Sequence, residues 1–423
     1  MGYVVERVIG MRRATTALFI YLTLSTLSIT AEADWPEFRG GSYAGHALNS
    51  DVPLRWYERD NVRWKVGVPG KAWSTPAVAE GRVYVTTATT EQSALSLQAR
   101  CYNLVTGEQI WEREAFKLEN GRIHKKNSHA SPSPIYDNGR LYVHFGHSGT
   151  ACIDARTGGV LWKQTGLPYK PVHGNGGSPL LFEDKLIFSC DGAEDPFVAA
   201  LDKVNGRILW KTYRDVEVSR SFSFSTPLPI EVNGRPQVII PGSGAVIAYD
   251  PREGIEIWRF RYGEGYSVVP RPVYSGGMIY VCSGFNQANL FAIKVDGQGD
   301  VTDTHLVWSE QKTIPKESSP IIVGDQLYLN DDKGILTCFD AATGSVHYRE
   351  RLDGKGGYSA SPVFANGHLF FHSGDGVTTV IKPGKNFAKV AENKINEFGL
   401  SSLAVTSDGF IVRTENHLWR IGE

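Results

Sequence analysis

Short apolar runs separated by polar turn residues recur along most of the chain, and the clearest copy spans residues 133–163. Four apolar runs follow one another in this copy, with turns at Asn138 and Gly139 and again at Thr157 and Gly158. Short β-branched and aromatic runs between glycine-containing turns are typical of strands joined by hairpins. The copy therefore predicts four short antiparallel strands.

One spacing of turn and aromatic residues repeats in five segments, with Gly four residues after an Asp or Asn and an aromatic residue eight after it. The Asp can accept hydrogen bonds from its own turn, and the Gly supplies the positive φ of a tight hairpin. The aromatic side chain is expected to seal the gap between neighbouring four-stranded units. We interpret these residues as structural. They are Asn103, Gly107 and Trp111; Asp154, Gly158 and Trp162; Asp202, Gly206 and Trp210; Asp250, Gly254 and Trp258; and Asp340, Gly344 and Tyr348.

A proline opens each copy of the repeat, except that Leu403 takes its place in the last copy. The steps average about 47 residues, which is near the period of known propeller blades. Four antiparallel strands in each of eight repeats predict an all-β, eight-bladed β-propeller. The repeated prolines are Pro76, Pro134, Pro179, Pro227, Pro272, Pro320 and Pro362.

The eighth copy has no outer strand of its own before the sequence ends. Residues 62–66 match the outer-strand type and precede the first copy. We therefore predict that they pair with residues 418–420, which closes the ring and removes an open sheet edge. The predicted propeller covers residues 61–423, after an N-terminal segment at residues 34–60.

Residues 1–33 have the features of a cleavable signal peptide. Arg7, Arg12 and Arg13 precede an apolar run at residues 14–29, and a small-x-small cleavage site ends at Ala33. The run is too short and too polar for a membrane span. We expect a secreted or periplasmic protein without a transmembrane span; the sequence leaves open whether Met1 or Met11 is the start.

The charge balance argues against two classes of partner. The chain has 44 basic and 45 acidic residues and a net charge of −1, so it offers no general basic surface for nucleic acid or anionic lipid.

The five cysteines are expected to be buried thiols and not a disulfide framework. Three of them occupy a small-residue position of the repeat, and the other two lie two blades apart. The three are Cys101, Cys152 and Cys338, where other copies have Ala200, Ala248 and Ala292; the remaining two are Cys190 and Cys282.

The pattern Asp-x-x-Thr-Gly-x-x-x-Trp at residues 154–162 resembles the tryptophan-docking repeat of pyrroloquinoline quinone (PQQ) propellers. Quinoprotein dehydrogenases and BamB-type outer-membrane assembly factors share this repeat. The resemblance covers residues 61–423, and residues 34–40 also look like the start of secreted PQQ-like propellers. It implies the fold but not the cofactor, since non-catalytic members have the same repeat.

Resemblance to the dehydrogenases implies PQQ above a calcium ion, an Asp base and a disulfide between adjacent cysteines. The chain has no adjacent cysteine pair. Loop oxygens for calcium are available in principle, but solvated turns have the same composition. BamB-type factors are lipoproteins, whereas no cysteine lies near the predicted cleavage site, so we expect no lipid anchor. The candidate calcium ligands are Glu194, Asp195, Asn286, Asp331 and Asp332.

Loops that enter the innermost strands converge on one end of a propeller channel, so residues before the repeat prolines are the candidate binding site. They combine aromatic, cationic and amide groups, which suit a polar or anionic ligand or a partner peptide. Residues 124–129 are expected to form an exposed recognition loop and not a metal site, because two histidines in a loop have no fixed geometry. The candidates are Trp73, His129, His173, Asn175, Arg220, Arg271, Lys316, Glu317 and Tyr358.

The sequence contains no Gly-x-Ser-x-Gly elbow, phosphate-binding glycine loop or His-Glu-x-x-His motif. We therefore interpret the chain as a monomeric, non-catalytic binding or assembly scaffold of the BamB-like type. Its expected partner is a protein or peptide of the cell envelope, with no catalytic residue, metal or cofactor assigned. The alternative is a PQQ-dependent oxidoreductase that uses PQQ and calcium to oxidise alcohols or sugars.

Overall fold

A computed structural model describes residues 1–3, 35–285 and 288–422. The chain divides into two units, Met1–Ala31 and Glu32–Glu423. The predicted signal peptide and its cleavage site lie almost wholly outside the described residues. The described residues include no helix with the length and apolar character needed to span a membrane.

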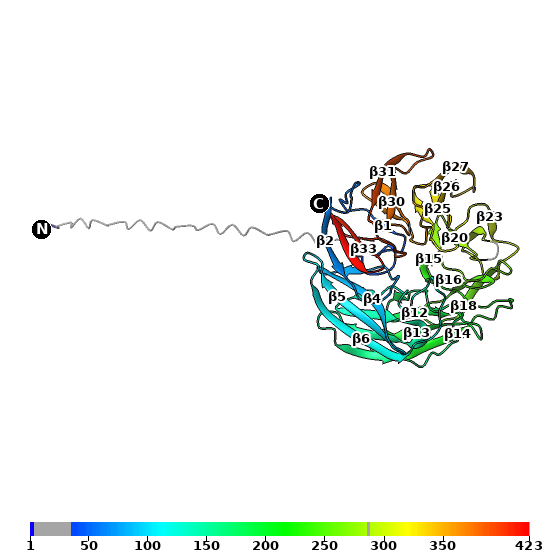
Figure 1. Ribbon diagram of the computed structural model, residues 1–423, viewed down its shortest axis with the longest axis horizontal. Helices are drawn as coiled ribbons and strands as arrows, with labels where there is room; N and C mark the ends of the chain where they lie inside the picture. The colour runs from blue at the N-terminus through cyan, green and yellow to red at the C-terminus, as the bar shows by residue number, and fades with distance from the viewer. Residues whose placement is uncertain (4–34, 286–287, 423) are drawn as a thin grey trace. The chain divides into compact units, whose positions relative to one another are not determined.

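The described residues of the second unit form eight sheets, one for each blade (Figure 1). Each blade has four antiparallel strands, and blade 8 takes its strands from both ends of the chain. Two sheets have a fifth strand that pairs in parallel, β1 in blade 7 and β22 in blade 4. Blade 1 has β3 (Ala77–Ala79), β4 (Arg82–Glu91), β5 (Ala94–Asn103) and β6 (Gln109–Glu119). Blade 2 has β7 (Ile135–Asp137), β8 (Arg140–His144), β9 (Thr150–Asp154) and β10 (Val160–Gln164), with the 3-10 helix η1 (Gly146–Ser148). Blade 3 has β11 (Leu180–Phe182), β12 (Lys185–Cys190), β13 (Phe197–Asp202) and β14 (Ile208–Tyr213). Blade 4 has β15 (Leu228–Val232), β16 (Arg235–Pro241), β17 (Ala245–Tyr249) and β18 (Glu256–Arg261).

The other four blades complete the ring. Blade 5 has β19 (Val273–Ser275), β20 (Met278–Cys282), β21 (Leu290–Lys294) and β23 (Leu306–Glu310). Blade 6 has β24 (Ile321–Val323), β25 (Gln326–Asn330), β26 (Ile335–Asp340) and β27 (Val346–Arg351). Blade 7 has β28 (Val363–Ala365), β29 (His368–His372), β30 (Val377–Ile381) and β31 (Lys389–Lys394). Blade 8 has β32 (Ala404–Val405), β33 (Gly409–Arg413), β34 (His417–Gly422) and β2 (Val62–Gly67).

The predicted repeat boundaries are confirmed. Each repeat proline, and Leu403 in the last copy, comes immediately before the innermost strand of its blade. The hairpin turn of blade 2 has φ of 45° at Asn138 and 77° at Gly139, as a two-residue turn between twisted strands requires. The eight-bladed, all-β fold predicted from the repeat is therefore correct.

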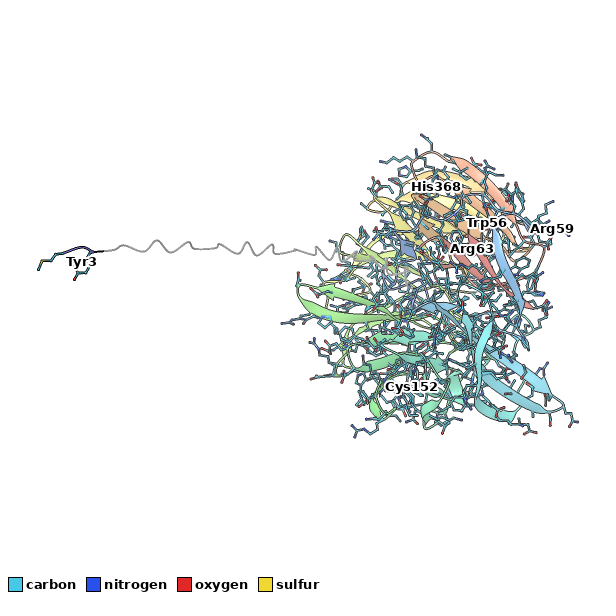
Figure 2. The ribbon with its side chains drawn as sticks, turned by 90° about the vertical axis from the view of Figure 1, so that its left-hand side faces the viewer. Tyr3, Trp56, Arg59, Arg63, Cys152 and His368 are labelled. Atoms are coloured by element: carbon cyan, nitrogen blue, oxygen red, sulfur yellow. The ribbon has the colours of Figure 1, made fainter. Side chains whose placement is uncertain are left out.

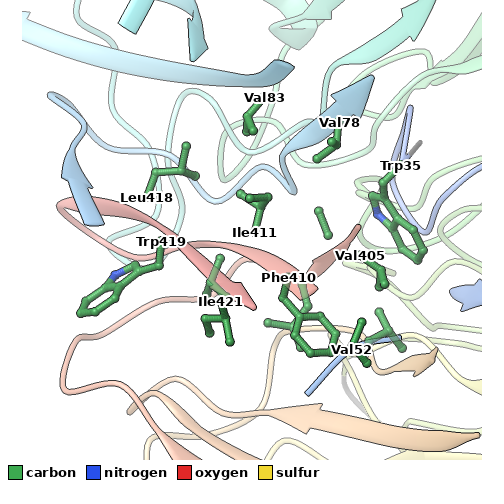
Figure 3. Packing of buried hydrophobic residues seen from close by; sticks show 14 of the residues in the cluster. Trp35, Val52, Val78, Val83, Val405, Phe410, Ile411, Leu418, Trp419 and Ile421 are labelled. Atoms are coloured by element: carbon green, nitrogen blue, oxygen red, sulfur yellow. The ribbon is translucent and has the colours of Figure 1, made fainter. Parts of the chain in front are cut away.

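The ring closes as predicted, because β2 pairs antiparallel with β34, with Val66 opposite Leu418 and Trp64 opposite Arg420. The closing blade shares one apolar cluster with the N-terminal segment. In Figure 3, Trp35 lies in the same cluster as Phe410 and Ile421 of blade 8. Both ends of the chain are thus fixed in one sheet and its core.

The repeated tryptophans seal the gaps between blades. Trp162 of blade 2 donates its indole N–H to the Lys203 carbonyl of blade 3 at 3.1 Å. Its ring covers Gly206, where a Cβ atom would lie 2.5 Å from Trp162 Cε3. A side chain at this glycine would therefore displace the tryptophan. The same docking recurs for Trp64 on Gly107, Trp111 on Gly158, Trp210 on Gly254 and Trp308 on Gly344.

Trp258 differs from the other repeated tryptophans in its hydrogen bond. It packs between blades 4 and 5, as expected, but its indole donates to Gln237 Oε1 of its own blade at 2.9 Å. The added strand β22 (Gly299–Asp300) runs parallel to β18 beside Trp258. This strand takes the place of the usual docking turn.

The structure confirms the reading of the cysteines, since all five are buried and unpaired. Cys101 lies opposite Trp111 in its sheet, and Cys152 lies opposite Trp162. Burial raises the pKa of the Cys101 thiol to about 12, so this group is not a reactive thiolate. Cys152 is seen within its blade in Figure 2.

The N-terminal segment crosses the channel between the innermost strands. Trp35 pairs with Val78 of blade 1, and Tyr136 of blade 2 donates its N–H to the Pro36 carbonyl at 2.8 Å. Further along, β1 (His46–Ala47) runs parallel to β28 of blade 7. The following Trp56 stacks on Phe370 of blade 7 with 6.2 Å between ring centroids, and Figure 2 labels it together with His368 of the same blade. The segment thus fills the channel and binds several blades to one another.

Candidate functional site

A cavity of about 350 Å³ lies at the channel mouth. Residues that precede the innermost strand line it in all eight blades, and Phe38 of the N-terminal segment lines it as well. The eight loops contribute Trp73 and Thr75; Lys126 and Ser133; His173 and Ser178; Arg220, Phe222, Phe224 and Thr226; Tyr266 and Val269; Glu317; Ser359 and Ser361; and Leu400 and Ser402.

Hydroxyl groups linked through backbone hydrogen bonds, which we call the hydroxyl relay, form part of the cavity lining. The N–H of Thr75 donates to Ser133 Oγ at 2.9 Å, Ser133 N–H to Ser178 Oγ at 2.9 Å, and Ser178 N–H to Thr226 Oγ1 at 3.0 Å. A second arc connects Arg271, Ser319, Ser361 and Ser402 in the same way. Each hydroxyl accepts one backbone N–H from the preceding blade, so its own O–H remains able to donate.

Aromatic rings form the wall between blades 3 and 5. Phe222 contacts His173 edge to face at 5.0 Å between ring centroids and Tyr266 at 5.4 Å. The Arg220 guanidinium lies 4.9 Å from the Tyr266 ring centroid and donates to the Tyr266 hydroxyl at 3.0 Å. This stacking holds a cation at the rim beside an apolar wall.

An ion pair spans the mouth. Lys126 Nζ contacts the two Glu317 carboxylate oxygens at 2.8 and 2.6 Å, from loops four blades apart in the ring of eight. Ser359 Oγ donates to the same carboxylate at 2.5 Å, and the Trp73 indole donates to the Lys126 carbonyl at 2.8 Å. The predicted recognition loop at residues 124–129 thus reaches the cavity through Lys126.

Four of the nine predicted site residues line the cavity, namely Trp73, His173, Arg220 and Glu317. Lys316 lies beside them, with its ammonium 5.0 Å from the Phe285 ring centroid. Binding by these residues stays a prediction.

The other four predicted residues do not line the cavity, and three of them have clear structural contacts. Asn175 is buried and donates to the Phe145 carbonyl at 2.8 Å. Tyr358 is buried against Gly334 and accepts the Gly354 N–H at 3.0 Å. Arg271 is buried beneath the cavity, where it donates to the Pro227 and Phe38 carbonyls at 2.9 Å each. His129 is half-buried, and burial lowers its pKa.

The sequence-based selection missed the hydroxyl relay and the aromatic wall. Ser or Thr directly precedes the repeat proline in six of the seven copies that have one, and Arg271 is the exception. This regular position of Ser or Thr would have allowed the hydroxyl relay to be predicted from the sequence. Phe222 and Tyr266 have no such signal, because they come from irregular loops of different length.

The repeat and ring geometry agree with the match to a family profile described as outer membrane protein assembly factor BamB, over residues 97–347 and 297–387. The chain belongs to this family of PQQ-like propellers.

Two curated relatives are similar over parts of the chain. Outer membrane protein assembly factor BamB from Shewanella oneidensis is 22% identical over 333 residues, 77% of this chain and 64% of that protein. Polyvinylalcohol dehydrogenase from Pseudomonas sp. is 25% identical over 225 residues, 49% of this chain and 31% of that protein. The matches thus span less than two thirds of either relative's own length.

A solved structure of BamB from Moraxella catarrhalis has the same fold. It aligns with a TM-score of 0.58 at 16% identity, over 85% of this chain and 99% of that chain. The likeness therefore concerns the fold of the BamB-type propeller.

The candidate calcium ligands do not come together in one cluster among the described residues. No group of three His, Cys, Asp or Glu residues among those described is placed to hold a metal ion. Glu194 pairs with Lys170 at 2.9 Å, and the Asp331 carboxylate accepts N–H groups of its own loop. Asp332 lies near the mouth and accepts the Lys316 N–H, whereas Asn286 lies outside the described residues.

Beneath the cavity, the N-terminal segment buries charged groups. Burial raises the pKa of Glu37 to about 8, against the attraction of Arg271, whose Nη1 lies 4.0 Å from Glu37 Oε1. Burial and the nearby Arg271 lower the pKa of Arg39 to about 9. Arg39 Nη2 still donates to the Pro320 carbonyl at 2.8 Å. The N-terminal segment that crosses the channel, called the plug from here on, therefore contains a carboxyl group, that of Glu37, which keeps its proton at neutral pH.

Glu37 should make stability pH-dependent. A carboxyl group with a raised pKa in the folded state stabilises the fold fully below its unfolded pKa, and the stabilisation is lost as pH rises toward about 8. Glu37→Gln should therefore match the native melting temperature at about pH 4, below the ordinary Glu pKa, and exceed it at about pH 9. Glu253→Gln, at an exposed turn, is the control. An unchanged difference between Glu37→Gln and the native chain across this pH range would contradict the assignment.

Proposed function

We propose that the protein is a non-catalytic binding or assembly scaffold of the cell envelope, which holds a protein partner at the channel mouth. The observation that supports this proposal most directly is the cavity itself, which takes residues from all eight blades. A closed ring holds such loops in fixed relative positions, so a partner meets a preorganised surface. Membership of the BamB-type family agrees with this role.

Location outside the cytoplasm is part of the proposal. It rests on the predicted signal peptide at residues 1–33 and on the name of the family, which refers to outer-membrane assembly. We propose that the mature protein is a monomer, in the periplasm or secreted. Its partner is then an outer-membrane or other cell-envelope protein.

Site-specific photocrosslinking tests where a partner binds. A photoreactive amino acid replaces Leu400, which lines the cavity, or Val346, which is exposed on the outer strand β27. We expect a discrete adduct with one cell-envelope protein from position 400 only. The adduct should disappear when Trp73→Ala and Phe222→Ala are added, because these changes remove apolar contact area at the mouth.

Two outcomes would count against the proposal. Equal adducts from positions 400 and 346 would indicate non-specific contact. The match to polyvinylalcohol dehydrogenase makes a PQQ-dependent oxidoreductase the second candidate function. Tight PQQ binding with calcium-dependent dye reduction by the purified protein would favour that function instead.

A further inference from the structure

The charged groups that line the cavity leave one cation without a counter-charge. Glu317 supplies the carboxylate of the lining, and Lys126 and Ser359 already bind both of its oxygens. Arg220 has no acidic partner among the described residues. Its guanidinium contacts Tyr266 instead, which fixes its place at the rim. The charge at the channel mouth therefore favours binding of a negatively charged group over a positively charged one.

The hydroxyl relay gives independent support for an acceptor-rich ligand. Ser133, Ser178 and Thr226 each accept a backbone N–H, and no acceptor for their own O–H groups is found among the described residues. Ser361 and Ser402 are in the same state in the second arc. Hydroxyl groups with one lone pair engaged act as donors toward a ligand. A carboxylate or peptide carbonyl would accept these bonds.

Two histidines at the cavity, His124 and His173, lie in the same positively charged environment. His124 and His173 lie 5.2 Å apart between ring centroids. Burial lowers the pKa of His173, and the neighbouring His124 and Arg220 lower it further. A protonated histidine here would add to uncompensated positive charge, so the site favours a ligand that brings negative charge.

We infer that the cavity binds a segment of the partner protein in which an acidic residue lies next to an aromatic one. Arg220 binds the carboxylate, and Phe222 and Tyr266 contact the aromatic ring. This inference rests on the proposed function and adds the chemistry of the recognised segment. A cavity of about 350 Å³ admits a few side chains, so a short exposed segment fits and a folded domain does not.

A basic segment would bind poorly for two reasons. Its cation would face Arg220, and it could reach Glu317 only by displacing Lys126 from contacts of 2.6 and 2.8 Å. A neutral segment would leave the Arg220 guanidinium without an anionic partner when the ligand removes its water, since its one side-chain hydrogen bond goes to the neutral Tyr266 hydroxyl. Discrimination by charge at this rim is therefore expected to depend on Arg220.

Fluorescence anisotropy with defined peptides tests this inference on the whole mature chain. The first probe is a labelled nine-residue peptide of alternating aspartate and phenylalanine; the second has asparagine in place of each aspartate. We expect the acidic peptide to bind about tenfold or more tightly, as a hydrogen bond to a charged partner predicts. Arg220→Gln should remove most of this difference. Arg207→Gln, at an exposed turn on an outer hairpin, should keep it.

Equal binding of the two peptides to the native chain, or a difference that survives in Arg220→Gln, would overturn the inference. Tight binding of phenylacetate alone, as strong as that of the acidic peptide, would overturn the assignment to a protein segment. Photocrosslinking separates the two proposals. An adduct at position 400 without charge discrimination refutes only the inference, whereas charge discrimination without any adduct refutes the proposed partner binding.

Discussion

Deletion of residues 34–68 should abolish the cooperative thermal transition of the propeller. The deleted stretch supplies β2, the outer strand of blade 8, and the segment that fills the channel. Five buried apolar side chains are lost with it, each worth roughly 1.5–3 kcal/mol. Their sum is on the order of 10 kcal/mol, comparable with the whole stability of a typical domain. The residues are Trp35, Val52, Trp56, Trp64 and Val68.

Deletion of residues 34–60 alone is the matched comparison, because it removes the plug and retains β2. This shorter deletion should keep a cooperative transition at a lower melting temperature, since the ring still closes through the ladder with β34. Differential scanning calorimetry of both variants and the native chain measures the difference. If the longer deletion melts at the native temperature, strand pairing does not close the ring.

The repeat determined most of the fold, because each blade forms from local signals that the sequence displays. Proline before the inner strand, glycine in the turn and tryptophan on the outer strand each have a single geometric role. Ring closure was predictable for the same reason, since β2 has the outer-strand pattern that the last copy lacks.

The site was predictable only in part, because it depends on long-range contacts. Lys126 and Glu317 meet across the mouth although 191 residues separate them. Asn175 lies in a loop that contributes other residues to the cavity, but its own side chain is buried and donates a hydrogen bond to the Phe145 carbonyl. The plug shows the same limit, since the sequence of residues 35–40 gives no indication that the segment passes through the channel.

Trp162→Ala should lower the free energy of unfolding by about 3–5 kcal/mol, because it opens a cavity between blades 2 and 3. The loss should appear in chemical denaturation, with peptide binding at the mouth unchanged after correction for the folded fraction. Native stability together with loss of binding would show that Trp162 belongs to the site and not to the blade interface.

Two glycines with the same backbone conformation separate packing from backbone strain. Gly206 and Gly234 both have φ of 75°, but a Cβ at Gly206 meets Trp162, whereas one at Gly234 meets nothing within 4 Å. Gly234→Ala should cost roughly 1–2 kcal/mol from the left-handed backbone alone. Gly206→Ala should cost clearly more in the native chain, because it displaces the indole. In a Trp162→Ala background its cost should fall to that of Gly234→Ala. Strictly additive effects would mean that the tryptophan and the glycine do not interact, and the docking contact would then lose its role in holding the blades together.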